Sequence, residues 1–123
     1  MDTKLLGRWG EALAAEYLKK KKFTLVGAGY RTRTGEIDLI AEDRKFVVFA
    51  EVKLRNGTFS AAPAEFVDKN KQRRIISAAQ AWLAAHGTDK QPRFDVIEIY
   101  APDGMKTEKP VINHIENAFG EDY

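Results

Sequence analysis

Four side chains suited to phosphate chemistry fall in two short runs of the sequence. The run GEIDLI at 35–40 carries Glu36 and Asp38, and the triplet EVK at 51–53 carries Glu51 and Lys53. Carboxylates crowded on a partly apolar surface repel one another and lose hydration, and a divalent cation relieves both effects. Two carboxylates and a backbone carbonyl could hold Mg²⁺ against a phosphate oxygen and lower the pKa of a bound water. Lys53 could steady that water or the charge that develops on phosphorus.

The elements that must position these side chains are two expected strands, 35–41 and 46–55. Alternation within 35–41 puts Glu36, Asp38 and Ile40 on one face and Ile37, Leu39 and Ala41 on the other. Taken alone, the triplet EVK is more typical of a solvated edge strand with alternating charges. The run GEIDLI at 35–40 makes a functional site the better interpretation. Both strands are otherwise too apolar to be solvent-exposed edge strands with incidental charges.

The turn between the two strands decides whether the carboxylates meet. With a turn of two or four residues centred on 43–44, Asp38 lies opposite Phe49 and Glu36 lies opposite Glu51. Opposed residues share one side of a sheet, so the carboxylates would share a face with the lysine. A turn of three or five residues would reverse this parity and separate them.

Composition narrows the chemistry further. The chain has 123 residues, 44% apolar and 31% charged, which is typical of one globular domain over residues 1–123. It has no cysteine and two distant histidines, His86 and His114, which argues against a structural zinc site. A catalytic metal would need oxygen ligands, which favours Mg²⁺ or Mn²⁺. The sequence shows no membrane-spanning run and no signal-peptide core, so we expect a cytoplasmic protein.

Charge is unevenly distributed along the chain. Residues 1–93 hold 18 Lys/Arg and 11 Asp/Glu, a net of +7, whereas residues 94–123 hold 2 and 7, a net of −5. A basic body with an acidic tail is compatible with an anionic partner. An unevenly charged solvated surface explains the same pattern equally well.

The hydrophobic pattern predicts a mixed α/β domain of order αβββαβ(β). The expected helices are 3–21 and 67–86, the second ending at Gly87, and the expected strands are 23–30, 35–41, 46–55, 94–100 and 111–115. We expect turns at 42–45 and 103–104, and a loop that contains Pro63.

Six motifs together resemble a known group of proteins. They are GRWGE at 7–11, YR at 30–31, GEIDLI at 35–40, FAEVK at 49–53, KQRRI at 71–75 and NHIENAF at 113–119. In this order and spacing they resemble the PD-(D/E)XK nuclease superfamily. More narrowly, they resemble the YraN-like family of small bacterial proteins, which is similar to the archaeal Holliday-junction resolvases. The resemblance covers nearly the whole chain.

The resemblance implies a restriction-endonuclease-like αβββαβ core, with a mixed central sheet flanked by helices and the active site on the central strands. It makes Asp38 and Glu51 the metal ligands, Lys53 the catalytic lysine and Glu11 an additional acid that holds the metal directly or through water. Resolvase relatives are homodimers, which would suit a two-armed substrate.

Two features remain open from the residues alone. Glu11 lies among small and apolar positions of the first helix, and Glu16 on its other stripe is an equal candidate for an acid aimed at the site. The run Lys71, Gln72, Arg73 and Arg74, with Lys69 before it, begins the second helix. This basic run has two interpretations: a solvated helix face, or a surface that contacts a phosphate backbone. The sequence alone favours the solvated face.

We therefore expect a Mg²⁺-dependent endonuclease that hydrolyses phosphodiester bonds, with Glu36 supporting the ligands. DNA is favoured over RNA. A branched or repair intermediate is favoured over a short specific site, because so small a domain has little room to read bases. The rival hypotheses are a non-catalytic nucleic-acid-binding module and a protein adaptor on the same fold.

Overall fold

The computed structural model describes residues 3–57 and 67–120. Within them the elements are α1 (Thr3–Lys20), β1 (Thr24–Arg31), β2 (Glu36–Glu42), β3 (Phe46–Arg55), α2 (Lys69–His86), β4 (Gln91–Tyr100), the 3₁₀ turn η1 (Gly104–Lys106) and β5 (Val111–Phe119). The predicted order of elements is confirmed. Pro63 lies outside the described residues.

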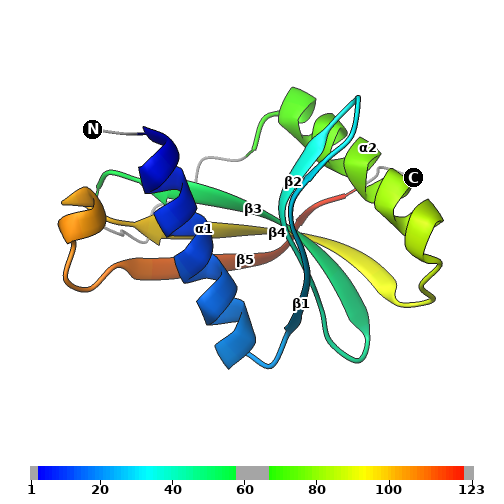
Figure 1. Ribbon diagram of the computed structural model, residues 1–123, viewed down its shortest axis with the longest axis horizontal. Helices are drawn as coiled ribbons and strands as arrows, with labels where there is room; N and C mark the ends of the chain where they lie inside the picture. The colour runs from blue at the N-terminus through cyan, green and yellow to red at the C-terminus, as the bar shows by residue number, and fades with distance from the viewer. Residues whose placement is uncertain (1–2, 58–66, 121–123) are drawn as a thin grey trace.

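The five strands form one mixed sheet in the order β1-β2-β3-β4-β5 (Figure 1). Neighbouring strands are antiparallel except β3 and β4, which run parallel because α2 carries the chain back between them. This is the restriction-endonuclease-like arrangement that the sequence predicts.

The two helices pack on opposite faces of the sheet. Val48 and Ala50 of β3 belong to the core cluster under α1, whereas Val47 and Phe49 of the same strand belong to the cluster under α2. Since successive side chains of a strand alternate, β3 is buried on both faces and reads as an almost continuous apolar run. The charged residues at the end of that run therefore stand directly beside the core.

Helix α2 has defined signals at both ends. The Asp68 carboxylate accepts the backbone N–H of Lys71 at 2.8 Å, which caps the N-terminus. Gly87 adopts the left-handed conformation, and its N–H donates to the carbonyl of Leu83 at 2.9 Å. The helix begins two residues later than predicted because Asp68 takes the capping position.

The last two strands extend beyond their predicted bounds. β4 starts at Gln91 rather than Phe94, because its parallel pairing with β3 begins at Phe46. β5 continues past Ile115 to Phe119, where it pairs with Phe94 after a register shift. The added residues include the polar runs 91–93 and 116–117, which the hydrophobic pattern does not identify as strand. They are extended because they lie beside neighbouring strands of the sheet.

The turn between β2 and β3 lies one residue later than predicted. The backbone N–H of Asp43 donates to the carbonyl of Phe46 at 3.0 Å, so Arg44 and Lys45 form a two-residue turn. The Asp43 carboxylate accepts the N–H groups of Lys45 and Phe46 at 2.9 and 2.8 Å. This Asx-type closure determines where the chain reverses.

The shifted turn keeps the predicted parity but moves the pairing by two residues. The expected pairs, Asp38 with Phe49 and Glu36 with Glu51, are wrong: Ile40 lies opposite Phe49. The correction moves Asp38 two residues closer to the level of Glu51 along the hairpin. The prediction that the carboxylates share one face is thus compatible with the structure, whereas the predicted register of β2 against β3 is wrong.

Candidate active site

The site forms where β2 and β3 stop pairing. Their paired residues end at Leu39 opposite Ala50. Beyond that point the carboxylate of Asp38 accepts the backbone N–H of Val52 at 2.8 Å. Where the backbone pairing of the two strands ends, the Asp38 side chain therefore accepts the N–H of Val52 in place of a backbone carbonyl. This bond holds the Asp38 carboxylate against β3.

The same divergence breaks the predicted alternation along β2. Ile37 packs in the core under α2, whereas Leu39 and Ala41 pack in the core under α1. Upstream of Leu39 the strand is paired with β1, through Tyr30 opposite Ile37. The expectation that 37, 39 and 41 share one face is wrong at Ile37, which lies beyond the last pair that β2 forms with β3.

Glu51 is the buried carboxylate of the site, with 7% of the residue exposed. Burial raises the pKa of Glu51 to about 8, helped by a hydrogen bond to Asp38 and by the charge of Asp38, while Lys71 and Lys53 act in the opposite direction. Two carboxyl groups in contact in a poorly solvated place favour a shared proton or a cation.

Lys71 supplies that cation in this structure. Its Nζ lies 3.4 Å from Oε1 of Glu36 and 3.7 Å from Oε2 of Glu51. Burial alone would lower the pKa of Lys71, but Glu51 and Glu36 outweigh it and raise the pKa. The first turn of α2 therefore contributes a charged group to the carboxylates of β2 and β3.

Lys53 stands on the same face of β3 as Glu51, two residues further along the strand. It is partly buried, and its charge acts to lower the pKa of Glu51. Within the described parts of the chain, Glu51 forms its ion pair with Lys71 and not with Lys53. The placement that the sequence predicts for Lys53, beside Glu51, is the one observed.

The geometry favours Glu11 over Glu16 as the acid of α1. Glu16 is exposed and lies 4.0 Å from Lys20, one helical turn away. Burial, followed by the charges of Asp38 and Glu36, raises the pKa of Glu11. Glu11 therefore faces the carboxylates from α1, although in residues 3–57 and 67–120 no three acidic or histidine side chains are close enough to hold one metal ion together.

The basic run of α2 divides into groups with different surroundings. Lys71 lies in the site, whereas Arg73 and Arg74 are exposed on the helix surface and Arg73 bonds to Asn70. Gln72 donates from Nε2 to the carbonyl of Val67 at 2.7 Å, which gives it a local partner. A role of these residues in nucleic-acid binding stays a prediction.

Gly35 sets the distance between β2 and α2. A Cβ at this position would lie 1.8 Å from the carbonyl oxygen of Arg74. Next to it, the hydroxyls of Thr34 and Ser77 are 2.5 Å apart. Because of this close approach, the β1–β2 turn packs directly against α2, and Glu36 lies within ion-pair distance of Lys71.

A second buried carboxylate, which was not predicted from the sequence, lies on the face that holds Lys53. Glu98 is fully buried in β4 and is paired in register with Lys53. It accepts bonds from Arg55 at 3.0 Å, Tyr100 at 3.1 Å and Asn113 at 2.9 Å. The glutamate inside the apolar run FDVIEIY could have indicated this site. A glutamate in a buried strand is rarely left without partners, so its position predicts a paired, buried carboxylate.

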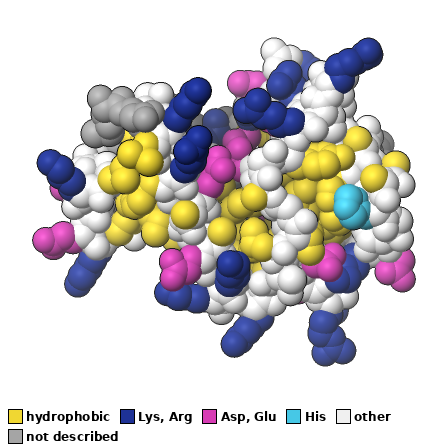
Figure 2. Space-filling view, in the orientation of Figure 1, with side chains coloured by type: hydrophobic (Ala, Val, Ile, Leu, Met, Phe, Trp, Pro, Cys, Tyr) yellow, Lys and Arg dark blue, Asp and Glu magenta, His cyan; other side chains and the backbone are white. Residues whose placement is uncertain are grey.

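Asp38 and Glu51 fit an oxygen-loving divalent cation. The Glu51 carboxyl is buried, it is hydrogen-bonded to the Asp38 carboxyl, and it already attracts the ammonium of Lys71. Figure 2 shows the acidic spot between the upper parts of the two helices, bordered by basic side chains. The donor set is thus suited to Mg²⁺ or Mn²⁺, with Glu11 and Glu36 close enough to act on it electrostatically.

In the described ranges, no helix is long and apolar enough to cross a membrane.

Comparison with known proteins gives a consistent match. The model of UPF0102, an uncharacterised protein family, matches residues 10–99, which include all the residues of the candidate site. A UPF0102 protein of Caldanaerobacter subterraneus subsp. tengcongensis is 41% identical over 121 residues, 97% of this chain and 98% of its own length. Those of Geotalea daltonii and Geobacter sulfurreducens are 44% and 43% identical, covering 96% and 95% of this chain and 91% and 90% of their own.

Proposed function

The chain belongs to the UPF0102 family, within the PD-(D/E)XK nuclease-like superfamily, and on this premise we propose that it is a metal-dependent nuclease that hydrolyses phosphodiester bonds in DNA. The observation that supports the proposal best is the contact between the carboxyls of Asp38 and Glu51 beside the core, with an ammonium group against them. A fold that needed only stability would gain more from apolar residues there, since burying charge is costly.

Each residue of the site has a role in this proposal. Asp38 and Glu51 hold Mg²⁺ or Mn²⁺, and the bound cation supplies charge stabilisation at the phosphate. Lys53 donates hydrogen bonds to the reacting phosphate, where negative charge develops. Glu11, with its raised pKa, accepts or holds a proton at its carboxylate oxygen at the edge of the site.

Lys71 has a second role in this proposal, in addition to the phosphate contact that the sequence suggests. Its ammonium compensates Glu36 and Glu51 in the metal-free protein. A divalent cation bound at Glu51 would repel this ammonium, and Lys71 at the start of α2 would then be available to a phosphate group. Arg73 and Arg74, exposed on the same helix, would contact the nucleic-acid backbone without reading sequence.

The preferred substrate is DNA with a branch or other irregular shape. The mixed sheet and two helices leave little surface for base readout, and the proposed contacts are made by charged side chains. Shape and phosphate geometry would then decide recognition.

A second candidate is a nucleic-acid-binding module without turnover on the same fold. It is favoured by one observation: Glu11 does not join Asp38 and Glu51 in a three-ligand set within the described residues. This candidate predicts DNA binding through α2 that is indifferent to divalent cations.

Cleavage assays distinguish the two candidates. Branched, flapped and linear DNAs should be incubated with the protein in Mg²⁺, Mn²⁺ or EDTA, beside the variants Asp38→Asn and Glu51→Gln. Glu16→Gln is the matched control, because it removes an exposed carboxylate that is paired only within α1. The nuclease proposal expects metal-dependent cleavage that both site variants abolish and the control retains. Absence of cleavage on all substrates, with binding intact, would favour the module.

A further inference from the structure

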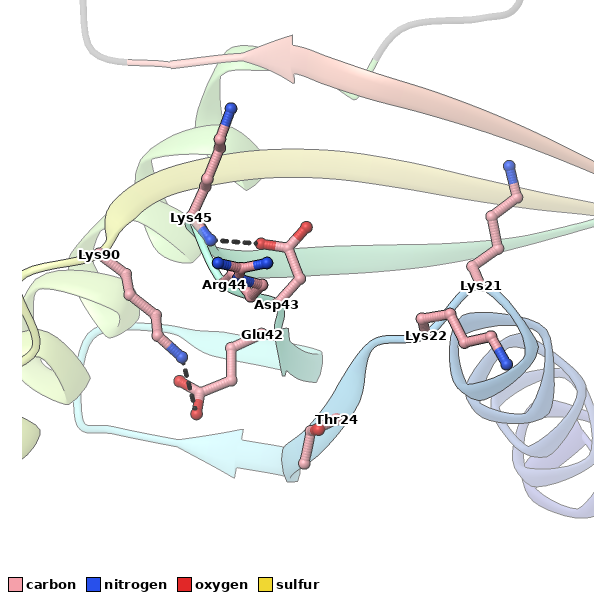
Figure 3. Close-up of a pocket in the computed structure, with 8 residues that line it drawn as sticks. All are labelled: Lys21, Lys22, Thr24, Glu42, Asp43, Arg44, Lys45 and Lys90. Atoms are coloured by element: carbon pink, nitrogen blue, oxygen red, sulfur yellow. Dashed lines mark hydrogen bonds and ion pairs between the residues drawn. The ribbon is translucent and has the colours of Figure 1, made fainter.

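A basic hollow lies at the end of the molecule away from the carboxylates. It is open to solvent, has a volume of about 790 Å³ and is lined by Lys21, Lys22, Thr24, Glu42, Asp43, Arg44, Lys45 and Lys90. Figure 3 shows that these side chains come from the segment just after α1, the start of β1, the β2–β3 turn and the approach to β4. Along the chain, Lys45 of the hollow lies six residues before Glu51, which is roughly 20 Å at about 3.3 Å per residue of strand.

Positive charge exceeds negative charge in this hollow. Five of its lining side chains are cationic and two are acidic, an excess of three. Glu42 pairs with Lys90 at 3.2 Å, and the Asp43 carboxylate accepts two backbone N–H groups of its own turn. The bond from Phe46 is the main cause that holds the pKa of Asp43 below its usual value. Both acids therefore have partners already, and the hollow presents an excess of positive charge to the solvent.

The fold does not require a lysine at the most constrained of these positions. Lys22 has φ of 74° at the end of α1, in the left-handed region where glycine is the usual residue. A side chain there costs about 1 kcal/mol. The helix dipole favours cations in the last turn of α1, which accounts for Lys19 and Lys20. It does not account for Arg44 or Lys45, which come from another element.

The lining determines which chemistry the hollow can recognise. Among the described residues that line it, none is aromatic or aliphatic, so it offers no platform for stacking bases or burying apolar groups. It offers ammonium, guanidinium and hydroxyl groups, which bind phosphate oxygens. Its backbone is also held in place, because Gln91 N–H donates to the carbonyl of Lys45 at 2.9 Å.

We propose that the basic hollow binds consecutive phosphate groups, either those of a nucleic-acid backbone or those of a free oligophosphate. The site is separate from the carboxylates and does not depend on whether they catalyse hydrolysis. Its cations are spread over three elements, which fits an extended ligand better than a single phosphate ion.

The test is an amide chemical-shift titration of the full chain in EDTA, with sodium tripolyphosphate and, separately, a short blunt DNA duplex. We expect saturable shifts at Lys22, Arg44 and Lys45. The variant Arg44→Gln/Lys45→Gln should bind tripolyphosphate at least about tenfold more weakly. Its log–log salt slope for the duplex should flatten by about 0.9 for each phosphate that the variant can no longer neutralise. The matched control is Lys106→Gln/Lys109→Gln, which removes the same charge at two exposed lysines elsewhere.

A second variant separates binding from folding. Lys22→Gly removes a cation and relieves the left-handed strain, so it should melt at or above the wild-type temperature and still bind phosphate more weakly. Shifts with both ligands indicate a nucleic-acid backbone, and shifts with tripolyphosphate alone indicate a free oligophosphate. The proposal is overturned if neither ligand shifts these amides, or if the hollow variants bind as the lysine control does.

Discussion

The ammonium nitrogen of Lys71 lies 3.7 Å from Oε2 of Glu51, a carboxylate with only 8% of its side chain exposed. The pair joins α2 to the central strand β3 on the face of the sheet where the core ends. Because Lys71 also contacts Glu36, one cation compensates two carboxylates. Its removal should therefore affect the site more than the loss of an ordinary surface lysine.

Lys71→Gln should destabilise the metal-free protein by about 1 kcal/mol, a small value because Lys71 is partly exposed and its pairs are screened. It should also raise Mg²⁺ affinity several-fold, since no ammonium then competes for Glu51. Calorimetric titration with Mg²⁺ and thermal melts in EDTA measure both effects. Lys69→Gln, an exposed neighbour in the same turn, is the control. Equal Mg²⁺ affinity in the two variants would contradict the arrangement.

Glu51 should make the stability of the metal-free protein fall as pH rises. Its pKa is raised from 4.5 to about 8 in the folded state, so between these values the folded protein holds a proton that the unfolded chain releases. Stability is then lost progressively across that window, by a few kcal/mol at most. Urea unfolding in EDTA at the two ends of the window, for wild type and Glu51→Gln, measures this. The variant should gain on the wild type as pH rises, and parallel pH profiles would refute the assignment.

Asp38→Asn and Asp38→Ala should differ in the metal-free protein. Asparagine keeps an oxygen that can accept the N–H of Val52 and removes the charge next to Glu51, so stability should be unchanged or higher. Alanine loses the acceptor as well and should cost about 1 kcal/mol relative to asparagine. Thermal melts in EDTA compare them. A large loss in the asparagine variant would point to a structural ion pair instead.

Gly35→Ala should disrupt the site from a distance. The added Cβ would meet the backbone of Arg74 in α2, which cannot move as a flexible side chain could. We expect a loss of at least about 2 kcal/mol and weaker Mg²⁺ binding, because the start of β2 moves away from Lys71. Gly7→Ala is the control, since nothing lies within 4 Å of its Cβ and helical alanine is favourable. If both variants behave alike, the close approach does not position the site.

The sequence predicted the order of elements and the face of β3 because hydrophobic periodicity reflects burial directly. The bounds of β3, for example, are those expected, Phe46–Arg55. The position of the β2–β3 turn was missed by one residue. It depends on the Asp43 carboxylate accepting the backbone N–H of Phe46, a bond that hydrophobic periodicity does not reveal.

Only some of the residues that form the site could be predicted from the sequence. Asp38 and Glu51 could be placed on one face from strand parity, but Lys71 was expected on a solvated helix face or against a phosphate backbone, and not against Glu51. Its contact with Glu51 depends on how closely α2 approaches β2, which Gly35 determines through tertiary packing. Helical spacing alone could not distinguish Lys71 from Arg74, since residues three apart share one helix face.

The most direct test of the central claim compares chemistry with binding in Lys53→Ala. Single-turnover cleavage of a branched DNA in Mg²⁺ should be run beside anisotropy titrations of the same DNA in Ca²⁺, for wild type, Lys53→Ala and Arg73→Gln/Arg74→Gln. If Lys53 stabilises the transition state, its loss should slow cleavage about 10²-fold and leave affinity nearly unchanged. The arginine variant should show weaker binding and a flatter salt dependence. Wild-type cleavage and binding in both variants would contradict the nuclease account.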